Sequence, residues 1–398
     1  MKRIWIPIAI IVFVIFCILL IPQKNFKVTW ASVDYPSMKQ KPLIKVYMES
    51  SGSMDGYLCA GSEFKDAIYS YVSTLASYSD SLQLNYINSQ ILPYKGSLQS
   101  FVRDLNVSSF RHIGGNRANS DLGDMFTQIL KYQNNNSVSI FISDCILDVP
   151  QGDTKDYLVN REIDIRNAFV KKLEQNKNLG VEIFRLESKF EGFHFSHNGR
   201  TRLTNVKRPY YMWIIGDKSL LSYLNSKVPF SEIKHGYKNY YAYSTYEEVP
   251  FEITNQFDLV QKPCVIKNSI NGNYVIKIRV DFSKTLQEES VICDLNRYCT
   301  QNPNKVFVSS IEKLLDTNDK NTHVLTLNIA ENIRSCAETI KFVLPQTPKW
   351  LDYANDETGD SIMKNLNRTT GIKNIISGVA SAYQNHLELA SIKFVINN

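Results

Sequence analysis

The sequence predicts an α/β fold in its first half, a mainly parallel sheet flanked by helices, and a β-rich, sandwich-like domain in its second half. Short apolar runs alternate with stretches whose apolar residues recur at helical spacing, which is typical of strands joined by crossover helices. Beyond residue 227 the pattern of residue types changes, and β-branched and aromatic residues alternate with polar ones in several short runs. With 398 residues, 43% of them hydrophobic and 21% charged, the chain can bury a core in each half.

The first predicted domain covers residues 41–227. A mostly apolar strand at residues 43–48 is followed by a helix whose apolar residues are Phe64, Ala67, Ile68, Tyr71, Val72 and Leu75. Further strands are predicted at residues 82–86, 138–142, 181–186 and 210–215, and further helices at 122–130, 165–173 and 220–224. Because parallel strands need crossover connections, this alternation predicts helices on both faces of the sheet.

The second predicted domain covers residues 228–398. Its strands are predicted at residues 240–243, 274–280, 323–329, 339–344 and 392–396, with one late helix at 372–383. The polar segment 352–370 separates the fourth of these strands from the helix. We expect that segment to be an exposed loop, since it offers few apolar side chains to a core.

The N-terminal segment is strongly apolar. Residues 4–21 are uncharged and follow Lys2 and Arg3, and they are just long enough to cross the hydrocarbon core of a bilayer. We therefore expect residues 1–22 to be an uncleaved transmembrane anchor with a cytoplasmic N-terminus, and 23–40 to be a linker. The rest of the chain is then extracytoplasmic, either periplasmic or at the cell surface. A cleaved signal peptide is the alternative, but no A-x-A pattern follows the apolar run.

Charge and cysteine content argue against two classes of protein. The net charge is +6, and no dense basic cluster indicates a nucleic-acid surface. The 7 cysteines are too few for a disulfide scaffold in a chain of this length, although Cys293 and Cys299 are close enough in sequence to form a bridge. No C-x-x-C spacing occurs, which argues against a zinc site built on cysteine.

Polar side chains follow three of the predicted strands. Glu49, Ser51 and Ser53 come directly after the first strand, and Ser143 and Asp144 end the strand at 138–142. A third group precedes the helix at 122–130 and contains Asn119, Ser120 and Asp121. Ligands of open α/β sheets bind at the carboxyl ends of the strands. Hydroxyl and carboxylate oxygens are the ligands that Mg²⁺ prefers, so these loops predict a site for a small hard cation.

The spacing in these loops resembles the von Willebrand factor A domain, a Rossmann-type fold. That family's metal-ion-dependent adhesion site uses Asp-x-Ser-x-Ser, a distant Thr and a later Asp. Residue by residue, Glu49 stands where the family has its first Asp, Ser51 and Ser53 match the serines, Ser120 replaces the Thr, and Asp144 matches the later Asp. The resemblance implies a bound Mg²⁺ or Mn²⁺ and a protein partner that presents an acidic residue.

Glu49 is the main departure from this pattern. Its side chain is one methylene longer than Asp, while Mg²⁺ bonds of about 2.0–2.1 Å tolerate little misplacement. Three arrangements follow: Glu49 coordinates the ion directly, hydrogen-bonds to a ligating water, or fills the site without metal. Asn119, Ser120 and Asp121 also have a simpler interpretation, because such residues commonly cap helices.

Other polar residues offer weaker signals. Arg111, His112 and Arg117 flank the second loop, and we expect solvated loop charges there, with contact to an acidic partner as the alternative. We expect no enzymatic activity, because neither Gly-x-Ser-x-Gly nor a phosphate-binding loop is present. A metal-dependent hydrolase using Glu49, Asp55 and Asp144 is the remaining enzymatic interpretation.

The function predicted from the sequence is therefore protein binding. We expect a membrane-anchored, extracytoplasmic protein with a domain of the von Willebrand factor A type, binding a partner through a divalent cation that a partner carboxylate completes. The alternative is a metal-independent scaffold subunit of an envelope complex.

Overall fold

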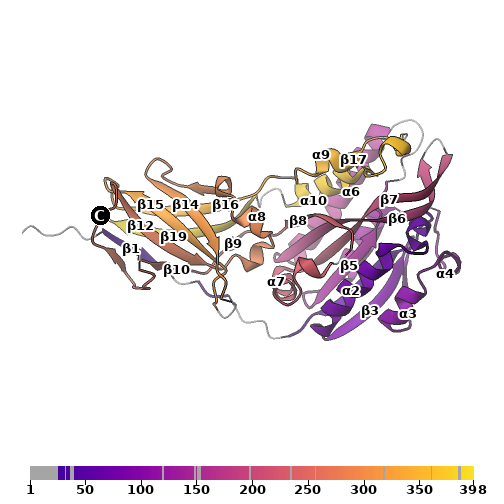
Figure 1. The fold of residues 1–398 in the computed structure, drawn as a ribbon, viewed down its shortest axis with the longest axis horizontal. Coiled ribbons are helices and arrows are strands. Elements are labelled where there is room, and N and C mark those ends of the chain that lie inside the picture. Colours follow the sequence, from indigo (N-terminus) through magenta and orange to yellow (C-terminus); the bar gives the residue numbers. More distant parts are fainter. Residues whose placement is uncertain are drawn as a thin grey trace, which may run out of the picture.

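The computed structural model describes residues 26–31, 33–35, 40–118, 121–147, 149, 154–196, 199–233, 235–255, 257–316, 319–359, 361–383 and 387–398. They form a mixed α/β structure with several sheets and a β-rich C-terminal region. Most helices gather around the largest sheet, and the six-stranded and four-stranded sheets form a second lobe at the other end of the molecule (Figure 1). We call these parts the α/β lobe and the β-rich lobe.

The α/β lobe is built on a seven-stranded sheet with the strand order β4-β3-β2-β5-β7-β6-β8. Its strands are β2 (Leu43–Glu49), β3 (Ser81–Ile87), β4 (Ile91–Tyr94), β5 (Ser137–Ser143), β6 (Leu179–Ser196), β7 (Gly199–Asp217) and β8 (Tyr237–Tyr243). Strand β2 pairs in parallel with β3 and β5, whereas the remaining pairings in this sheet are antiparallel. The prediction of a mainly parallel sheet is therefore wrong, and the sheet is mixed.

The error comes from β6 and β7, which form one long hairpin. Their register runs from Leu179 opposite Asp217 to Ser196 opposite Gly199. Residues 181–186 and 210–215 are strands, as predicted, but the residues between them extend both strands and form no crossover helix. Because a parallel pairing needs a long crossover, a hairpin can only return antiparallel.

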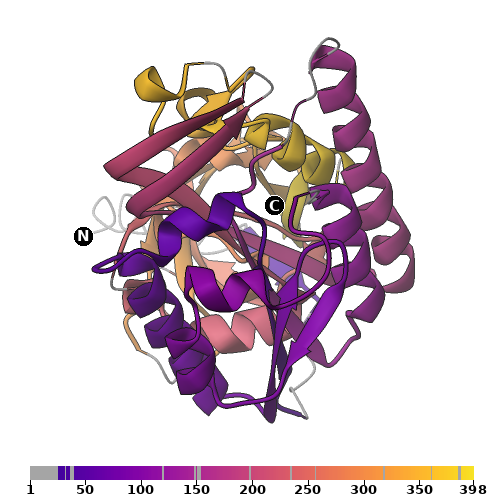
Figure 2. The ribbon, with the colours of Figure 1, turned by 90° about the vertical axis from the view of Figure 1, so that its right-hand side faces the viewer.

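Helices cover both faces of the seven-stranded sheet, as predicted (Figure 2). Each face of the sheet carries its own hydrophobic core, and the side chains of β5 alternate between them. Phe141 packs against Phe126 on one face, while Ile140 and Ile142 point to the other. The first face carries α5 (Leu122–Tyr132), α6 (Thr154–Gln175) and α10 (Ile372–Ala382). The second carries α2 (Glu63–Ser77), α3 (Leu98–Arg103), α4 (Val107–Arg111) and α7 (Lys218–Lys227).

The β-rich lobe contains two sheets that share one hydrophobic core, as in a sandwich. One has the order β11-β1-β19-β16-β13, with β9 also beside β19, and the other has the order β10-β12-β15-β14. Their strands are β1 (Phe26–Trp30), β9 (Glu247–Glu248), β10 (Phe251–Thr254), β11 (Cys264–Ile266), β12 (Asn273–Val280), β13 (Tyr298–Thr300), β14 (Val306–Lys313), β15 (His323–Ala330), β16 (Cys336–Val343) and β19 (Glu388–Asn397). The predicted closing strand and late helix correspond to β19 and α10.

The two lobes are interleaved along the chain. Strand β1 lies inside the segment predicted as a linker, and it pairs with β19 near the C-terminus of the chain. Strand β8 lies beyond residue 227 but completes the seven-stranded sheet. Helix α10 also comes from the second half, and its Asn374 Nδ2 donates to Glu162 Oε2 of α6 at 3.0 Å. The predicted boundaries therefore do not coincide with the edges of the lobes.

The polar segment 352–370 is not an exposed loop, contrary to the prediction. It contains parts of α9 (Leu351–Ala354), β17 (Asn355–Asp356), the 3-10 helix η5 (Ile362–Lys364) and β18 (Thr369–Thr370). Asp356 is buried, and it accepts hydrogen bonds from the backbone N–H groups of Thr358 and Gly359, both at 3.2 Å. Polar residues are buried here because their partners lie within the segment itself.

The prediction of a single-pass membrane protein is corrected. Across the described ranges, no helix is both long and apolar enough to cross a membrane. The longest, α6, has 22 residues but carries charged side chains along its length. The predicted anchor, residues 1–22, lies outside the described residues.

Candidate functional site at the carboxyl edge of the sheet

The first and third predicted loops meet at one edge of the sheet. Strands β2 and β5 are parallel neighbours, with Met48 opposite Ile142, so Glu49 and Ser143 end them side by side. Glu49 is 2% exposed, and its Oε2 accepts a hydrogen bond from the Ser143 hydroxyl. The same Ser143 oxygen accepts the backbone N–H of Cys145 at 2.7 Å. The longer arm of Glu49 is thus used to reach the neighbouring strand.

The serines of the first loop also face each other. The Ser51 and Ser53 hydroxyl oxygens lie 3.0 Å apart, and Ser53 begins the 3-10 helix η1 (Ser53–Leu58). Tyr57 in η1 is fully buried, and its hydroxyl donates to the carbonyl of Pro209 on β7. This contact fixes the loop to the sheet and holds the two hydroxyls in position.

Asp144 is a deeply buried acid of the site. It is 1% exposed, and its Oδ1 accepts the backbone N–H of Ile146 at 3.3 Å, while Oδ2 is buried without a hydrogen-bond partner among the described residues. Burial raises the pKa of Asp144, although the Ser53 hydroxyl and the Arg208 guanidinium oppose this shift. A buried, unsatisfied carboxylate oxygen is costly, so this arrangement is typical of a site that takes up a proton or a cation.

Arg117 is part of this site and is not a solvated loop charge, so that prediction is wrong. Its Nε donates to the Ser50 carbonyl at 2.8 Å, and its Nη2 donates to the Ser51 carbonyl at 3.1 Å and pairs with Asp55. Burial raises the pKa of Asp55, and Arg117 acts against that shift. Asp55, the third acid of the hydrolase interpretation, is therefore engaged by a cation of the protein itself. Arg111 is exposed, as expected.

The second predicted loop is described only in part. Asn119 and Ser120 lie outside the described residues, so the structure does not place the predicted Ser120 ligand. Asp121 caps α5, accepting the backbone N–H groups of Gly123 at 2.8 Å and Asp124 at 3.2 Å. It also pairs with Arg161 of α6. The simpler interpretation of Asp121 as a helix cap is confirmed.

A cavity of about 340 Å³ opens beside these loops. Its lining residues are Ser51, Gly52, Ser53, Arg117, Ala118, Ile146 and Phe195. Phe195 comes from the β6–β7 hairpin and is 43% exposed. The site thus offers two hydroxyls, a guanidinium and one apolar wall to a ligand. We call Glu49, Ser51, Ser53 and Asp144, with this cavity, the edge site.

Sequence reasoning missed two residues that shape the edge site. Arg208 is 2% exposed and donates to the carbonyls of Leu366 and Arg368, at 3.2 and 3.3 Å, while its charge acts on Asp144. Phe195 forms the apolar wall. Both belong to the hairpin, and the predicted strands 181–186 and 210–215 do not extend to these residues, so nothing in the sequence placed them near the loops.

Comparison with known proteins adds no identification. No protein-family model matches the chain, and no curated protein matches its sequence. The assignment of function therefore depends on the geometry of the edge site and on the motif residues.

Proposed function

We propose that this chain is a protein-binding molecule whose α/β lobe is a variant von Willebrand factor A-like domain. In this proposal the edge site binds Mg²⁺ or Mn²⁺, and a carboxylate of a protein partner completes the coordination of the ion. The observation that carries the proposal is the buried Oδ2 of Asp144, which has no hydrogen-bond partner among the residues that the structure describes, while the nearby Ser53 hydroxyl lowers the pKa of that carboxyl.

The ligand chemistry supports a hard cation. The side chains gathered at this edge offer oxygen atoms, from the hydroxyls of Ser51 and Ser53 and the carboxylates of Glu49 and Asp144. Mg²⁺ takes six oxygen ligands, is commonly held by one or two carboxylates and keeps several positions for water or an external ligand. The adjacent cavity leaves space for a partner carboxylate.

The local topology supports the fold assignment at the same edge. The three neighbouring strands β3, β2 and β5 run parallel, and the motif loops follow β2 and β5. Ligand sites of α/β sheets form at this position. The antiparallel half of the sheet, β7, β6 and β8, is the part that departs from a Rossmann-type arrangement.

A metal-independent scaffold is the second candidate, and Arg117 is the observation that favours it. This side chain already bridges the first loop through the Ser50 and Ser51 carbonyls and pairs with Asp55. The loop is therefore held in place by a cation that belongs to the protein. In this candidate the domain binds partners through its shape, and added metal has no effect.

Titration of the full chain with Mg²⁺ and Mn²⁺ separates the two candidates. A cation at 100 times its Kd should add about 2.7 kcal/mol to the free energy of unfolding, measured by thermal or urea unfolding. Asp144→Asn should abolish this gain. Asp121→Asn is the matched control, because Asp121 lies near the same edge but caps α5, and it should keep the full gain. An unchanged melting temperature at saturating metal would refute the cation site and leave the scaffold.

A further inference from the structure

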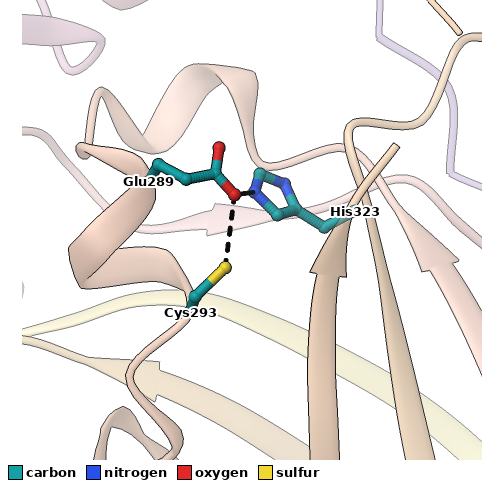
Figure 3. Close-up of side chains that lie close together, drawn as sticks. All are labelled: Glu289, Cys293 and His323. Carbon is teal, nitrogen blue, oxygen red and sulfur yellow. Dashed lines mark hydrogen bonds and ion pairs between the residues drawn. The ribbon is translucent and has the colours of Figure 1, made fainter. Parts of the chain in front are cut away.

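A second group of potential metal ligands lies in the β-rich lobe, far from the edge site in the sequence. Glu289 begins the short helix α8 (Glu289–Ile292), Cys293 is the residue that caps it, and His323 begins β15. Residues four apart on a helix share a face, so Glu289 and Cys293 point the same way. Figure 3 shows both side chains directed toward the imidazole of His323.

The two distances from Glu289 Oε1 to the other ligand atoms are close to those around a tetrahedral ion. Cys293 Sγ lies 3.2 Å from Glu289 Oε1, and His323 Nε2 lies 3.3 Å from the same oxygen, with all three atoms within 4.8 Å of one another. Zinc bonds of about 2.0–2.1 Å to oxygen or nitrogen and about 2.3 Å to sulfur place ligand atoms about 3.3–3.6 Å apart. The protein atoms are therefore close to the positions that a bound ion requires.

The hydrogen-bond network leaves a lone pair of His323 aimed at the carboxylate. The Thr322 hydroxyl donates to the Val280 carbonyl at 3.3 Å, so its oxygen is an acceptor for His323 Nδ1, 2.8 Å away. This assigns the imidazole proton to Nδ1 and leaves Nε2 as an acceptor. His323 is 3% exposed, and its Nε2 is buried without a hydrogen-bond partner among the described residues.

Two electron-rich atoms thus face each other across 3.3 Å. Glu289 Oε1 lies between His323 Nε2 and the Cys293 thiol, which donates to it at 3.2 Å. A cation that replaces the thiol proton now shared by Cys293 and Glu289 Oε1 would bind the sulfur and the oxygen and also give His323 Nε2 a partner. The bond from Nδ1 to Thr322 is also the outer contact that orients a metal-binding histidine.

The surroundings leave one coordination position open. Lys313 Nζ binds the other carboxylate oxygen of Glu289, Oε2, at 3.0 Å, so Oε1 remains directed at the cysteine and histidine. Glu289 and His323 also line a cavity of about 580 Å³, which α7 borders through Ser222, Asn225 and Ser226. Three protein ligands beside an open cavity are typical of zinc sites that keep a position for water or substrate.

We propose that Glu289 Oε1, Cys293 Sγ and His323 Nε2 form a Zn²⁺ site, the junction site, whose fourth position faces the cavity and takes water or an exchangeable anion. Binding displaces the thiol proton of Cys293 to solvent and forms a zinc–thiolate bond. Sulfur and nitrogen ligands select zinc over Mg²⁺, so this site and the edge site take different ions. The proposal does not depend on the proposed function of the edge site.

The sequence does not indicate this site, because its ligands match no known zinc-binding spacing. Cys293 and His323 are 30 positions apart in the sequence, and the spacing Glu-x-x-x-Cys lacks the C-x-x-C pattern that indicates cysteine-based zinc sites. Cys293 and Cys299 are close enough in sequence to form a bridge, but both are free thiols in the structure. Cys293 therefore remains available as a ligand.

The test is Zn²⁺ binding to the full chain without a histidine tag, in a phosphine reductant, measured by calorimetry. We expect one Zn²⁺ per chain, and Co²⁺ should give the ultraviolet absorption of a cobalt–thiolate bond. Cys293→Ser and His323→Gln should each weaken Zn²⁺ binding by about 100-fold or more, and Cys293→Ser should remove the thiolate band. Cys299→Ser, an exposed thiol nearby in sequence, and Asp144→Asn, in the edge site, should leave both signals unchanged.

Two results would overturn the junction site. One is Zn²⁺ binding by the wild-type chain that neither Cys293→Ser nor His323→Gln weakens. The other is a Co²⁺ complex of the wild-type chain without a thiolate band, which needs no variant and therefore does not depend on how the variants fold. Circular dichroism of each variant shows whether a lost signal reflects lost structure.

Discussion

The edge site and the region around the junction cavity both hold carboxyl groups away from water, but they surround them differently. At the edge, arginines supply positive charge, since Arg117 pairs with Asp55 and Arg208 acts on Asp144. Near the junction cavity, Glu182 is 1% exposed and accepts hydrogen bonds from Asn225 Nδ2 at 2.6 Å and the Tyr240 hydroxyl at 2.8 Å, which are both neutral donors.

This difference indicates which kind of cation each region is suited to bind. An arginine beside a buried acid opposes the effect of burial and favours the charged form, and together with hydroxyl groups such an acid favours a hard, oxygen-seeking cation. A buried acid that has only neutral donors tends to hold its proton, so it adds little negative charge. Glu182 is therefore not one of the proposed Zn²⁺ ligands, which are Cys293, His323 and Glu289, whose carboxylate pairs with Lys313.

Glu182→Gln should produce the largest effect and tests whether Glu182 holds its proton in the folded protein. Burial raises the pKa of Glu182 from 4.5 to about 7. The proton-linked stability is therefore complete below pH 4.5 and is lost as the pH rises through 7, which amounts to about 3 kcal/mol. Glutamine stays neutral, so at pH 8 the variant should be more stable than the wild type by up to that amount.

Urea unfolding at pH 5 and pH 8 measures this difference directly. Glu191→Gln, which changes an exposed glutamate on the same strand, is the control, and its difference in stability from the wild type should be the same at both pH values. If Glu182→Gln shows the same stability difference from the wild type at both pH values, Glu182 is ionised in the folded protein, and the contrast between the two regions fails.

The elements of the fold that were predicted correctly are those in which apolar residues recur at a regular spacing. Apolar residues follow one regular pattern along the whole of residues 43–48, 64–75 and 138–142. These segments form β2, α2 and β5. The hairpin β6–β7 was missed because residues 187–209 are largely polar and do not show which strand they continue. Strand β1 was missed because its pairing with β19 joins opposite ends of the chain, and local sequence does not encode such a contact.

Arg117→Ala should have the second largest effect and tests how far the protein's own cations hold the edge site. The change removes hydrogen bonds to the carbonyls of Ser50 and Ser51 and leaves Asp55 without its cation. The Arg117 side chain is 18% exposed, so we expect a loss of about 2 kcal/mol in the free energy of unfolding, from urea unfolding.

Arg111→Ala provides the matched control for this measurement. Arg111 lies in the last turn of α4 and is exposed, so its removal should cost less than about 0.5 kcal/mol. Equal losses from the two arginine variants would show that Arg117 contributes only as a surface charge. The edge site would then depend on its hydroxyl groups and on a bound ion for its order.

The candidate edge site could be predicted in its residues but not in its interactions. The spacing of Glu49, Ser51 and Ser53 after a strand, and of Asp144 after the neighbouring one, is visible in the sequence and places them at one edge. Their partners are not visible, because Arg208 approaches from the hairpin. The junction site was not predicted at all, since its ligands come together only when α8 packs beside the first residue of β15.

Asp144→Asn should have the smallest effect on the metal-free protein, and it tests whether the edge site keeps an acid at the expense of stability. Burial raises the pKa of Asp144, so its ionised form destabilises the fold as the pH rises through the pKa of the folded state. Asparagine has the same shape without the charge. The metal-free variant should therefore be more stable than the wild type at pH 8 by about 1 kcal/mol, and this advantage should vanish in acid. Urea unfolding in a chelator at pH 8 and pH 4 measures the difference. A variant that is less stable than the wild type at pH 8 would show that the Asp144 carboxylate contributes to folding, and the edge site would then be better explained as structural.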